Sequence, residues 1–438
     1  MKPLFPAALA AALVLASWQP SQAQTAARPA WGRVSFFTNA SNTTADSGSS
    51  SFSELIGTAT FESPSGDDVH LEYRADVRFA GYPGSSYRAR RISIYDAYVG
   101  KRFNGGRMAV RAGQMWLNEL GGLGAVGGGL FEVGQPRHEK RGRWRAVAFA
   151  GLEPRTLEAG YVTNVLKAGA FAAFDGVGLR RHVVGVVALR NQGLIERSVV
   201  VINNLLPVSR RLFVYQAAEY DVKSAGIASP GSLTYFFGNA RYTATRVLEF
   251  QGSYHRGRSI DSRTIVRDQL DGRAVDPRVL DGLRFESASG RVTVTIRPGL
   301  RVYGGYGRDR NNHDDAASTR VTYGVFASDV GGSGLDVTAS DSRMQRPGGN
   351  SYNSWYVSLG RSFSRRVYLS GDYGSSLSVV RFVTASGFLI ETRPHSRRLA
   401  FSSLFNLTRV ASLLASVERV ADGTSTQTRL MSGINYRF

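Results

Sequence analysis

The sequence predicts an all-β protein: a transmembrane antiparallel up-and-down β-barrel of about 22 strands, with a range of roughly 16 to 22. Two observations predict this fold. Apolar and polar side chains alternate residue by residue over many segments, and short spacers between these segments take turns with long ones. Because successive side chains of a strand point to opposite faces, each segment has one apolar and one polar face. No helical pattern of comparable strength interrupts the series.

The first residues predict an export signal. Lys2 supplies a short positive region, Ala7 to Ala16 is an unbroken apolar run, and Ser21-Gln22-Ala23 offers small residues for a signal peptidase. We therefore expect a signal peptide at residues 1–23 and one barrel domain at 24–438, with no plug domain. The chain has no Cys, so a lipid-anchored cysteine, disulfides and thiolate metal sites are excluded.

Composition is compatible with a barrel and points to anionic partners. The chain is 42% hydrophobic, its mean hydropathy is −0.18 and its formal net charge is +20. A barrel strand has one lipid face and one water face, so its average hydropathy is near neutral. The positive field fits nucleic acid, anionic lipid headgroups or small anions. Export from the cytoplasm disfavours nucleic acid, which leaves lipopolysaccharide phosphates and anionic solutes.

The clearest alternating segment is Val69 to Phe79, and further segments begin near Leu248, Leu300, Trp355 and Leu399. A soluble sandwich could show the same alternation, but the pattern recurs along most of the chain. The polar faces of these and neighbouring segments supply the pore-lining candidates, which are His70, Glu72, Arg74, Asp76, Arg78, Arg111, Glu249, Gln251, His255, Arg301 and Tyr356.

The spacers predict the orientation of the strands. Short spacers such as 103–106, 297–299 and 364–366 fit periplasmic turns, whereas long polar ones such as 40–51 and 256–282 fit external loops. The first strand is then Trp31 to Asn39, with the N-terminus periplasmic. Residues 377–392 fit an extension of one hairpin above the membrane, and 256–282 a short helix or a segment folded over the pore mouth.

The last ten residues carry an apolar face formed by Leu430, Ser432, Ile434, Tyr436 and Phe438, and the chain stops on the last aromatic residue. This stretch resembles the C-terminal signal of Gram-negative outer-membrane β-barrels, including porin-like proteins. The resemblance implies an outer-membrane location and recognition by the barrel-assembly machinery, with Leu430, Ile434, Tyr436 and Phe438 as the assembly signal.

Residues 116–141 are expected to form one long loop. Gly122-Leu123-Gly124-Ala125-Val126-Gly127 matches the dinucleotide-binding spacing G-x-G-x-x-G, but more Gly follows and no helix former takes over, so no cofactor is expected. In porins a long early loop folds into the lumen, and the resemblance suggests a constriction here, with Arg137, Lys140 and Arg141 favouring anions. The alternative is a solvated external loop touching lipopolysaccharide.

Catalytic and metal motifs are absent from the sequence. The six His residues show no i, i+3 or i, i+4 spacing, and neither H-E-x-x-H nor G-x-S-x-G occurs. We therefore expect no enzyme and no metal site.

The sequence favours a porin-like channel for passive diffusion of small polar, preferentially anionic, solutes. Two alternatives stay open: a barrel that exports an anionic polymer such as a polysaccharide, and a non-conducting structural or surface barrel. The expected partners are outer-membrane lipid, lipopolysaccharide, the barrel-assembly machinery and small solutes, and the chain could form homo-oligomers.

Overall fold

The chain forms one antiparallel sheet that closes on itself. The computed structural model describes residues 30–64, 71–83, 91–135, 142–155, 158–177, 179–225, 231–259, 261–275, 279–280, 282–314, 316–383 and 388–438. The first strand, β1 (Trp31–Ala45), pairs with both β2 (Gly48–Glu62) and the last strand, β23 (Ser425–Arg437). The predicted signal peptide and the candidates His70, Arg137, Lys140 and Arg141 lie outside the described residues.

From β2 to β19 each strand pairs with the strands before and after it in sequence, and β21 to β23 continue the ring. The first half of the ring continues with β3 (Leu71–Gly81), β4 (Arg91–Phe103), β5 (Met108–Trp116), β6 (Ala125–Gly134), β7 (Arg143–Pro154), β8 (Tyr161–Asp175), β9 (Arg181–Asn191), β10 (Leu194–Pro207) and β11 (Leu212–Ser224). The second half consists of β12 (Ser232–Thr243), β13 (Leu248–Ser259), β14 (Leu283–Arg297), β15 (Leu300–Asn311), β16 (Ser318–Ala327), β17 (Leu335–Gln345), β18 (Ser351–Ser362), β19 (Val367–Val383), β21 (His395–Asn406) and β22 (Ala411–Ala421).

One strand stands outside the ring. β19 pairs with β21 along the barrel wall, and its last residues pair with the short β20 (Leu389–Thr392) beyond the wall. The barrel therefore has 22 strands in its ring, which confirms the predicted fold and count. The hairpin extension expected at residues 377–392 is also confirmed.

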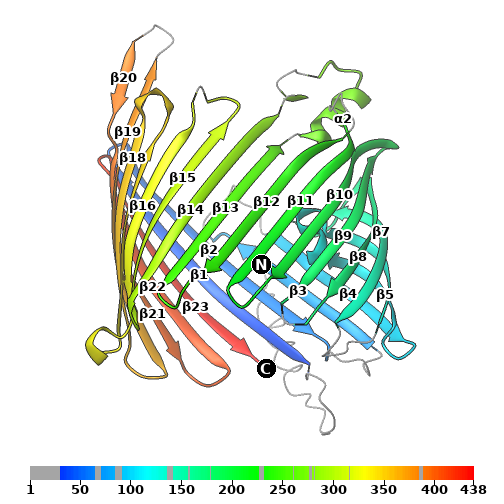
Figure 1. Cartoon of the computed structure of the whole chain (residues 1–438), viewed down its shortest axis with the longest axis horizontal. Helices are drawn as coiled ribbons and strands as arrows, with labels where there is room; N and C mark the ends of the chain where they lie inside the picture. Colours follow the sequence, from blue (N-terminus) through cyan, green and yellow to red (C-terminus); the bar gives the residue numbers. More distant parts are fainter. Residues whose placement is uncertain are drawn as a thin grey trace.

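The two ends of the barrel differ (Figure 1). We call the end that holds Trp31 and Phe438 the turn end, where most connections are short. The opposite end, the loop end, carries the helix α2 (Ser262–Leu270), the β19–β20 hairpin and the short 3-10 helices η1 (Asn118–Leu123) and η3 (Pro347–Gly349). A further 3-10 helix, η2 (Val330–Gly332), belongs to a turn at the turn end.

Hydroxyl side chains close four connections at the turn end. Ser209, for example, accepts hydrogen bonds from the backbone N–H groups of Arg211 and Leu212. Thr245 and Thr408 accept the same pair of bonds, and Ser364 accepts one from the backbone N–H of Arg366. Such side-chain-closed turns let a few residues reverse the chain, which fixes the register of the strands they join.

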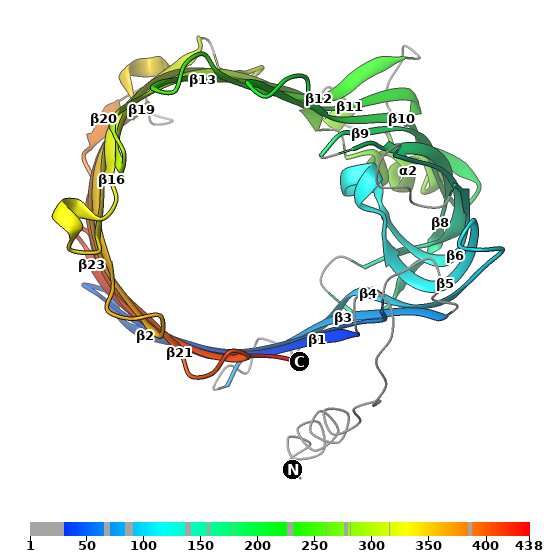
Figure 2. The same cartoon turned by 60° about the horizontal axis from the view of Figure 1, so that its bottom comes forward.

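The register of the strands assigns each side chain to one face. Going round the ring, paired residues such as Val201 and Gly185, or Gln251 and Arg291, share a face, and the assignment is consistent when β23 meets β1. The inner face is the one that contacts η1, which lies inside the ring (Figure 2). The outer face carries an exposed apolar band that includes Val110, Phe131, Leu166, Val184, Val186, Phe250, Val292, Val294, Val321, Leu359, Phe401, Val417, Leu430 and Ile434.

Two boundaries predicted from the sequence are wrong. The first strand continues to Ala45, so 40–51 is a tight β1–β2 hairpin rather than a long loop. The loop predicted at 116–141 contains the whole of β6, and only its first part folds inward as η1. The glycines of β6 are there for close packing: an added Cβ at Gly128 would collide with the Ala150 carbonyl, and one at Gly127 with the Tyr161 ring.

Candidate functional site: the inner wall of the barrel

One side of the barrel interior is filled with apolar side chains. The fully buried Leu120 of η1 packs against the inner face at Gly185 of β9, where an added Cβ would lie 2.9 Å from the leucine Cδ2. Around it, inner-face residues of β5 to β10 form a dry core, which includes Met115, Val126, Leu130, Val147, Phe149, Val165, Phe171, Val183, Val187 and Val199. We call this region, between η1 and β5–β10, the filled side.

Charged residues next to this core neutralise one another. Glu132 of β6, whose side chain is 3% exposed, lies 2.5 Å from Arg143, 3.2 Å from Arg111 and 3.7 Å from Arg102. Glu72 of β3 pairs with Arg102 at 2.7 Å and with Arg111 at 2.8 Å. The network links five neighbouring strands. Because its arginines are held by buried carboxylates, they are poorly placed to attract a passing anion.

A second ion-pair group ties η1 to the wall. Arg145 of β7 binds Glu119 of η1 and also lies 3.2 Å from Asp175 of β8, which in turn pairs with Arg181 of β9 at 2.7 Å. Leucine packing and a charged contact therefore hold the same short helix against β7 to β9.

The helix α2 covers the filled side at the loop end. Arg263 pairs with Glu153 at the end of β7 and lies 3.4 Å from Glu196 of β10. The α2 side chains of Ile265 and Val266 are fully buried. The connection between β13 and β14 thus reaches past β11 and β12 to close the top of the filled side (Figure 2). Of the two alternatives expected for residues 256–282, the short helix is present.

The N-terminus of α2 is capped by Asp261. Its carboxylate accepts hydrogen bonds from the hydroxyl of Thr264 at 2.6 Å and from the backbone N–H of Thr264 at 3.0 Å. These bonds lower the pKa of Asp261, the hydroxyl bond being the largest cause. The charged carboxylate also suits the positive end of the helix dipole.

Beneath α2 lies a polar cavity of about 310 Å³. On its wall Arg197 contacts Asp221 at 2.7 Å and Glu219 at 2.8 Å, and the hydroxyl of Thr234 donates to Asp221 at 2.8 Å. Ser262 of α2 completes this part of the lining. Arg258 also lines the cavity, and the Arg197 guanidinium already has two carboxylate partners.

The wall from β13 through β23 to β1 has a different character, and we call it the open side. Its inner-face arginines Arg291, Arg301 and Arg429 are exposed, so solvent reaches the interior beside them. Hydroxyl groups are frequent on this wall, among them Ser289, Ser340, Ser342, Ser354, Ser358, Ser370, Ser376, Ser402 and Ser416.

Unpaired charges also concentrate on the open side and the strands next to it. Seven inner-face arginines form no ion pair within the described part of the chain, namely Arg33, Arg78, Arg91, Arg291, Arg301, Arg429 and Arg437. Inner-face carboxylates without an arginine or lysine partner there are fewer, namely Glu54, Asp76, Asp336 and Asp372. The water-accessible wall therefore has a modest excess of positive charge.

All ten described pore-lining candidates lie on the inner face, but in different surroundings. Glu72 and Arg111 belong to the network of the filled side. Arg74 is held between Glu62 at 3.5 Å and Asp96 at 3.2 Å. Asp76 and Arg78, on the same strand, form no ion pair with a described residue.

The remaining candidates lie along β13, β15 and β18. Glu249 pairs with Arg241 at 2.7 Å, and Gln251 accepts a hydrogen bond from Arg291 at 3.0 Å. His255 packs among three aromatic rings, the nearest being Phe285 at 4.8 Å. The guanidinium group of Arg301 lies over the Phe326 ring, 4.9 Å from its centre. The hydroxyl of Tyr356 donates a hydrogen bond to Asp372 at 2.7 Å.

The predicted C-terminal signal lies on the outer face. Leu430, Ile434, Tyr436 and Phe438 are all exposed there. Phe438 exchanges backbone hydrogen bonds with Gly32 of β1, and its ring packs against Tyr436 at 5.8 Å. The end of the chain therefore closes the barrel and continues its apolar outer band.

Sequence reasoning missed the filled side. The run Val183-Val184-Gly185-Val186-Val187 in β9 is apolar on both faces, which is typical of a strand buried on both sides. In a barrel strand, such a run indicates that something packs against the inner face. That signal was available and would have located the partner wall of η1.

Within the described ranges, no helix is long and apolar enough to span a bilayer, and no group of three or more potential metal ligands occurs.

No protein-family model and no curated protein matches the sequence. Solved structures with a similar overall shape exist. The translocation pore of the P pilus usher PapC has a TM-score of 0.45 and 12% identity, covering 92% of this chain and 99% of that one. OccAB4 of Acinetobacter baumannii has a TM-score of 0.43 and 9% identity, with 94% and 99% covered. OccK8 (OprE) of Pseudomonas aeruginosa has a TM-score of 0.41 and 8% identity, with 93% and 98% covered. At these values the similarities do not establish a family for this chain.

Proposed function

We propose that the protein is an outer-membrane channel for passive diffusion of small polar solutes, with a preference for anions. The observation that carries this proposal is the combination of a closed ring, an apolar outer band and exposed arginines on the inner face of the open side. A membrane barrel needs an apolar outer surface, because lipid cannot solvate polar groups, and a polar inner surface where water passes.

The path for solutes would run along the open side. Exposed guanidinium groups and serine hydroxyls line it, whereas the filled side is closed by η1, the apolar core and α2. Inner rings of arginine attract anions. Because four inner carboxylates also lack an arginine or lysine partner among the described residues, we expect a moderate anion preference rather than an exclusive one.

The orientation follows the usual arrangement of such barrels, with short turns in the periplasm and longer loops outside. The turn end would then face the periplasm and α2 the exterior. Assembly would depend on recognition of the C-terminal strand by the barrel-assembly machinery, and lipopolysaccharide would surround the loop end.

Planar-bilayer recording under a potassium chloride gradient tests the proposal. We expect single-channel steps whose reversal potential is displaced toward that of chloride. The variant Arg291→Glu with Arg301→Glu should move the reversal potential toward potassium. Arg419→Glu changes the charge by the same amount per site but lies on the outer face, so it should leave selectivity unchanged.

If the folded wild-type barrel gives no current, the proposal is contradicted and a structural or surface role is favoured. Cation selectivity of the wild type would refute the anion preference. Equal shifts from the inner-face and outer-face variants would show that the open side is not the solute path.

A further inference from the structure

A cluster of arginines lies on the outer face of β13, β14 and β15 at the loop end. Arg256 of β13 and Arg310 of β15 are the register partners of Glu286 in β14, one on each side. Arg308 lies two residues from Arg310 on the same face, and Arg284 lies two residues from Glu286. All five side chains are exposed, so four guanidinium groups surround one carboxylate on an outward-facing surface.

Glu286 does not neutralise Arg308 and Arg310. Glu286 accepts a hydrogen bond from the hydroxyl of Tyr254 at 2.9 Å. Arg308 and Arg310 form no ion pair with any residue that the structure describes. Other arginines near the loop end differ in this respect, since Arg343 pairs with Asp341 and Arg381 with Glu391.

A hollow accompanies the positive charge. A cavity of about 540 Å³ opens at the loop end of β12 to β15, and Arg256, Arg284 and Arg310 line it together with Asn311 and Asn312. Guanidinium groups bind phosphate oxygens through two parallel hydrogen bonds. Clustered arginines therefore suit a ligand that carries phosphate better than a neutral ligand.

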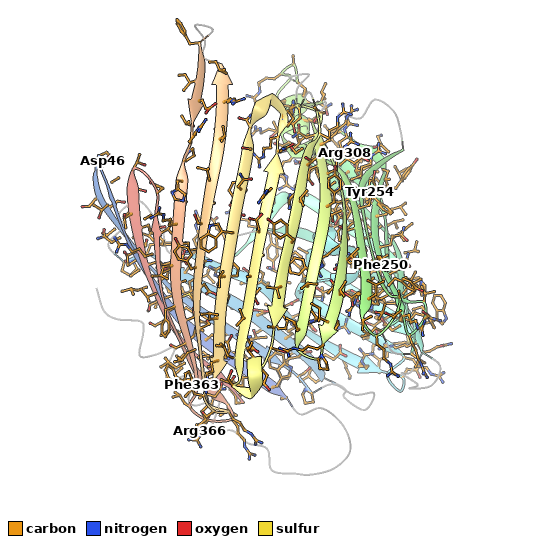
Figure 3. The ribbon with its side chains drawn as sticks, turned by 60° about the vertical axis from the view of Figure 1, so that its left-hand side comes forward. Asp46, Phe250, Tyr254, Arg308, Phe363 and Arg366 are labelled. Atoms are coloured by element: carbon orange, nitrogen blue, oxygen red, sulfur yellow. The ribbon has the colours of Figure 1, made fainter. Side chains whose placement is uncertain are left out.

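The cluster lies directly beyond the apolar band. Along β13 and β15, Phe250, Tyr254 and Arg308 follow one another toward the loop end (Figure 3). Exposed Tyr306 and Val292 belong to the same outer surface. An amphiphile with its phosphates on the arginines would therefore have its acyl chains against an apolar wall, as at a membrane interface.

We propose that Arg256, Arg284, Arg308 and Arg310 bind the phosphate groups of a multiply acylated, phosphorylated glycolipid of the surrounding leaflet, the lipid A part of lipopolysaccharide. The site requires that the barrel lies in a membrane, but it does not depend on what passes through the lumen. It would anchor one lipid at a fixed place on the wall next to α2.

The test uses purified full-length barrels in detergent and native mass spectrometry with bisphosphorylated lipid A. Arg308→Glu with Arg310→Glu should weaken binding by about 30-fold or more, since each basic residue near a phosphate-bearing surface contributes most of a tenfold factor. Arg365→Glu with Arg366→Glu makes the same charge change at the turn end and should leave affinity unchanged. Lipid A stripped of both phosphates should bind the wild type as weakly as the Arg308/Arg310 variant binds the intact lipid.

Equal losses in both double variants, or equal binding of phosphorylated and dephosphorylated lipid, would overturn the proposal. Displacement of the lipid by micromolar inorganic phosphate would also overturn it, because the site would then serve a free anion. Heat-modifiable electrophoretic mobility checks that each variant is folded. Since no current is recorded, failure here leaves the channel proposal untouched.

Discussion

Replacing Gly185 by alanine tests whether η1 is docked on the inner wall. An added Cβ would lie 2.8 Å from the Cβ of Phe171, 2.9 Å from the Cδ2 of Leu120 and 3.1 Å from the carbonyl oxygen of Ala170. These separations are tighter than ordinary van der Waals contact, and the leucine is fully buried. Both the Leu120 side chain of η1 and the β8 chain at Phe171 must therefore shift.

Overpacking of this kind costs about 1–3 kcal/mol of unfolding free energy. A loss of one or two kcal/mol changes the ratio of folded to unfolded protein by about 5- to 30-fold. The assay is urea unfolding of the purified barrel in detergent, followed by the mobility difference between folded and unfolded protein on unheated gels. If η1 loosens, the variant should also show a larger single-channel conductance.

Gly307 provides the matched control, because it also lies on the inner face of a strand and its added Cβ would find no atom closer than 3.7 Å. Gly307→Ala should change the unfolding free energy by less than about 0.5 kcal/mol. If Gly185→Ala and Gly307→Ala have the same urea midpoint and the same conductance, η1 does not pack on Gly185 and the account of the filled side is wrong.

Three further predictions concern other parts of the wall. Glu132→Gln leaves buried arginines without their carboxylate and should cost about 3–5 kcal/mol in the same urea assay, whereas Glu391→Gln on the exposed hairpin should leave the urea midpoint unchanged. Phe438→Ala should lower the amount of folded barrel in outer-membrane fractions, and Phe363→Ala, which removes a turn-end aromatic residue outside the final strand, should not. Because the pKa of Asp261 is lowered in the folded state, its stabilisation of α2 is present above about pH 4 and is lost as the pH falls through the folded pKa. Protease protection of residues 262–270 should follow that curve in the wild type and become independent of pH over this range in Asp261→Asn, which keeps the cap without the charge.

The alternation of apolar and polar residues within each strand was enough to predict the ring and its two faces. In β3, β13, β15 and β23 one residue in two is polar, so the register of each strand can be anticipated from its own sequence. The inner position of Arg74, Gln251 or Arg301 follows directly from that pattern. The strand count also followed, because short turns and long connections punctuate the chain.

Other features depend on contacts between distant segments, which one strand cannot reveal. The partners of Glu132 come from β4, β5 and β7, so its network depends on the register of three separate pairings. The glycines of β6 suggested a flexible loop, although they are required for close approach of β7 and of the Tyr161 ring. The reach of α2 to Glu153 depends on the curvature of the wall, which no local pattern encodes.

Cysteine accessibility at successive positions of β14 tests whether water fills the open side, and the natural chain has no Cys that would interfere. Single cysteines at Ser289, Arg291 and Thr293 would face the lumen, and those at Gly290, Val292 and Val294 the lipid. We predict that a negatively charged, membrane-impermeant thiol reagent modifies the first three and lowers the current, while the other three react only with lipid-soluble reagents. Equal reactivity of both sets, or inner-face cysteines that are modified without any change in current, would contradict a water-filled path along the open side.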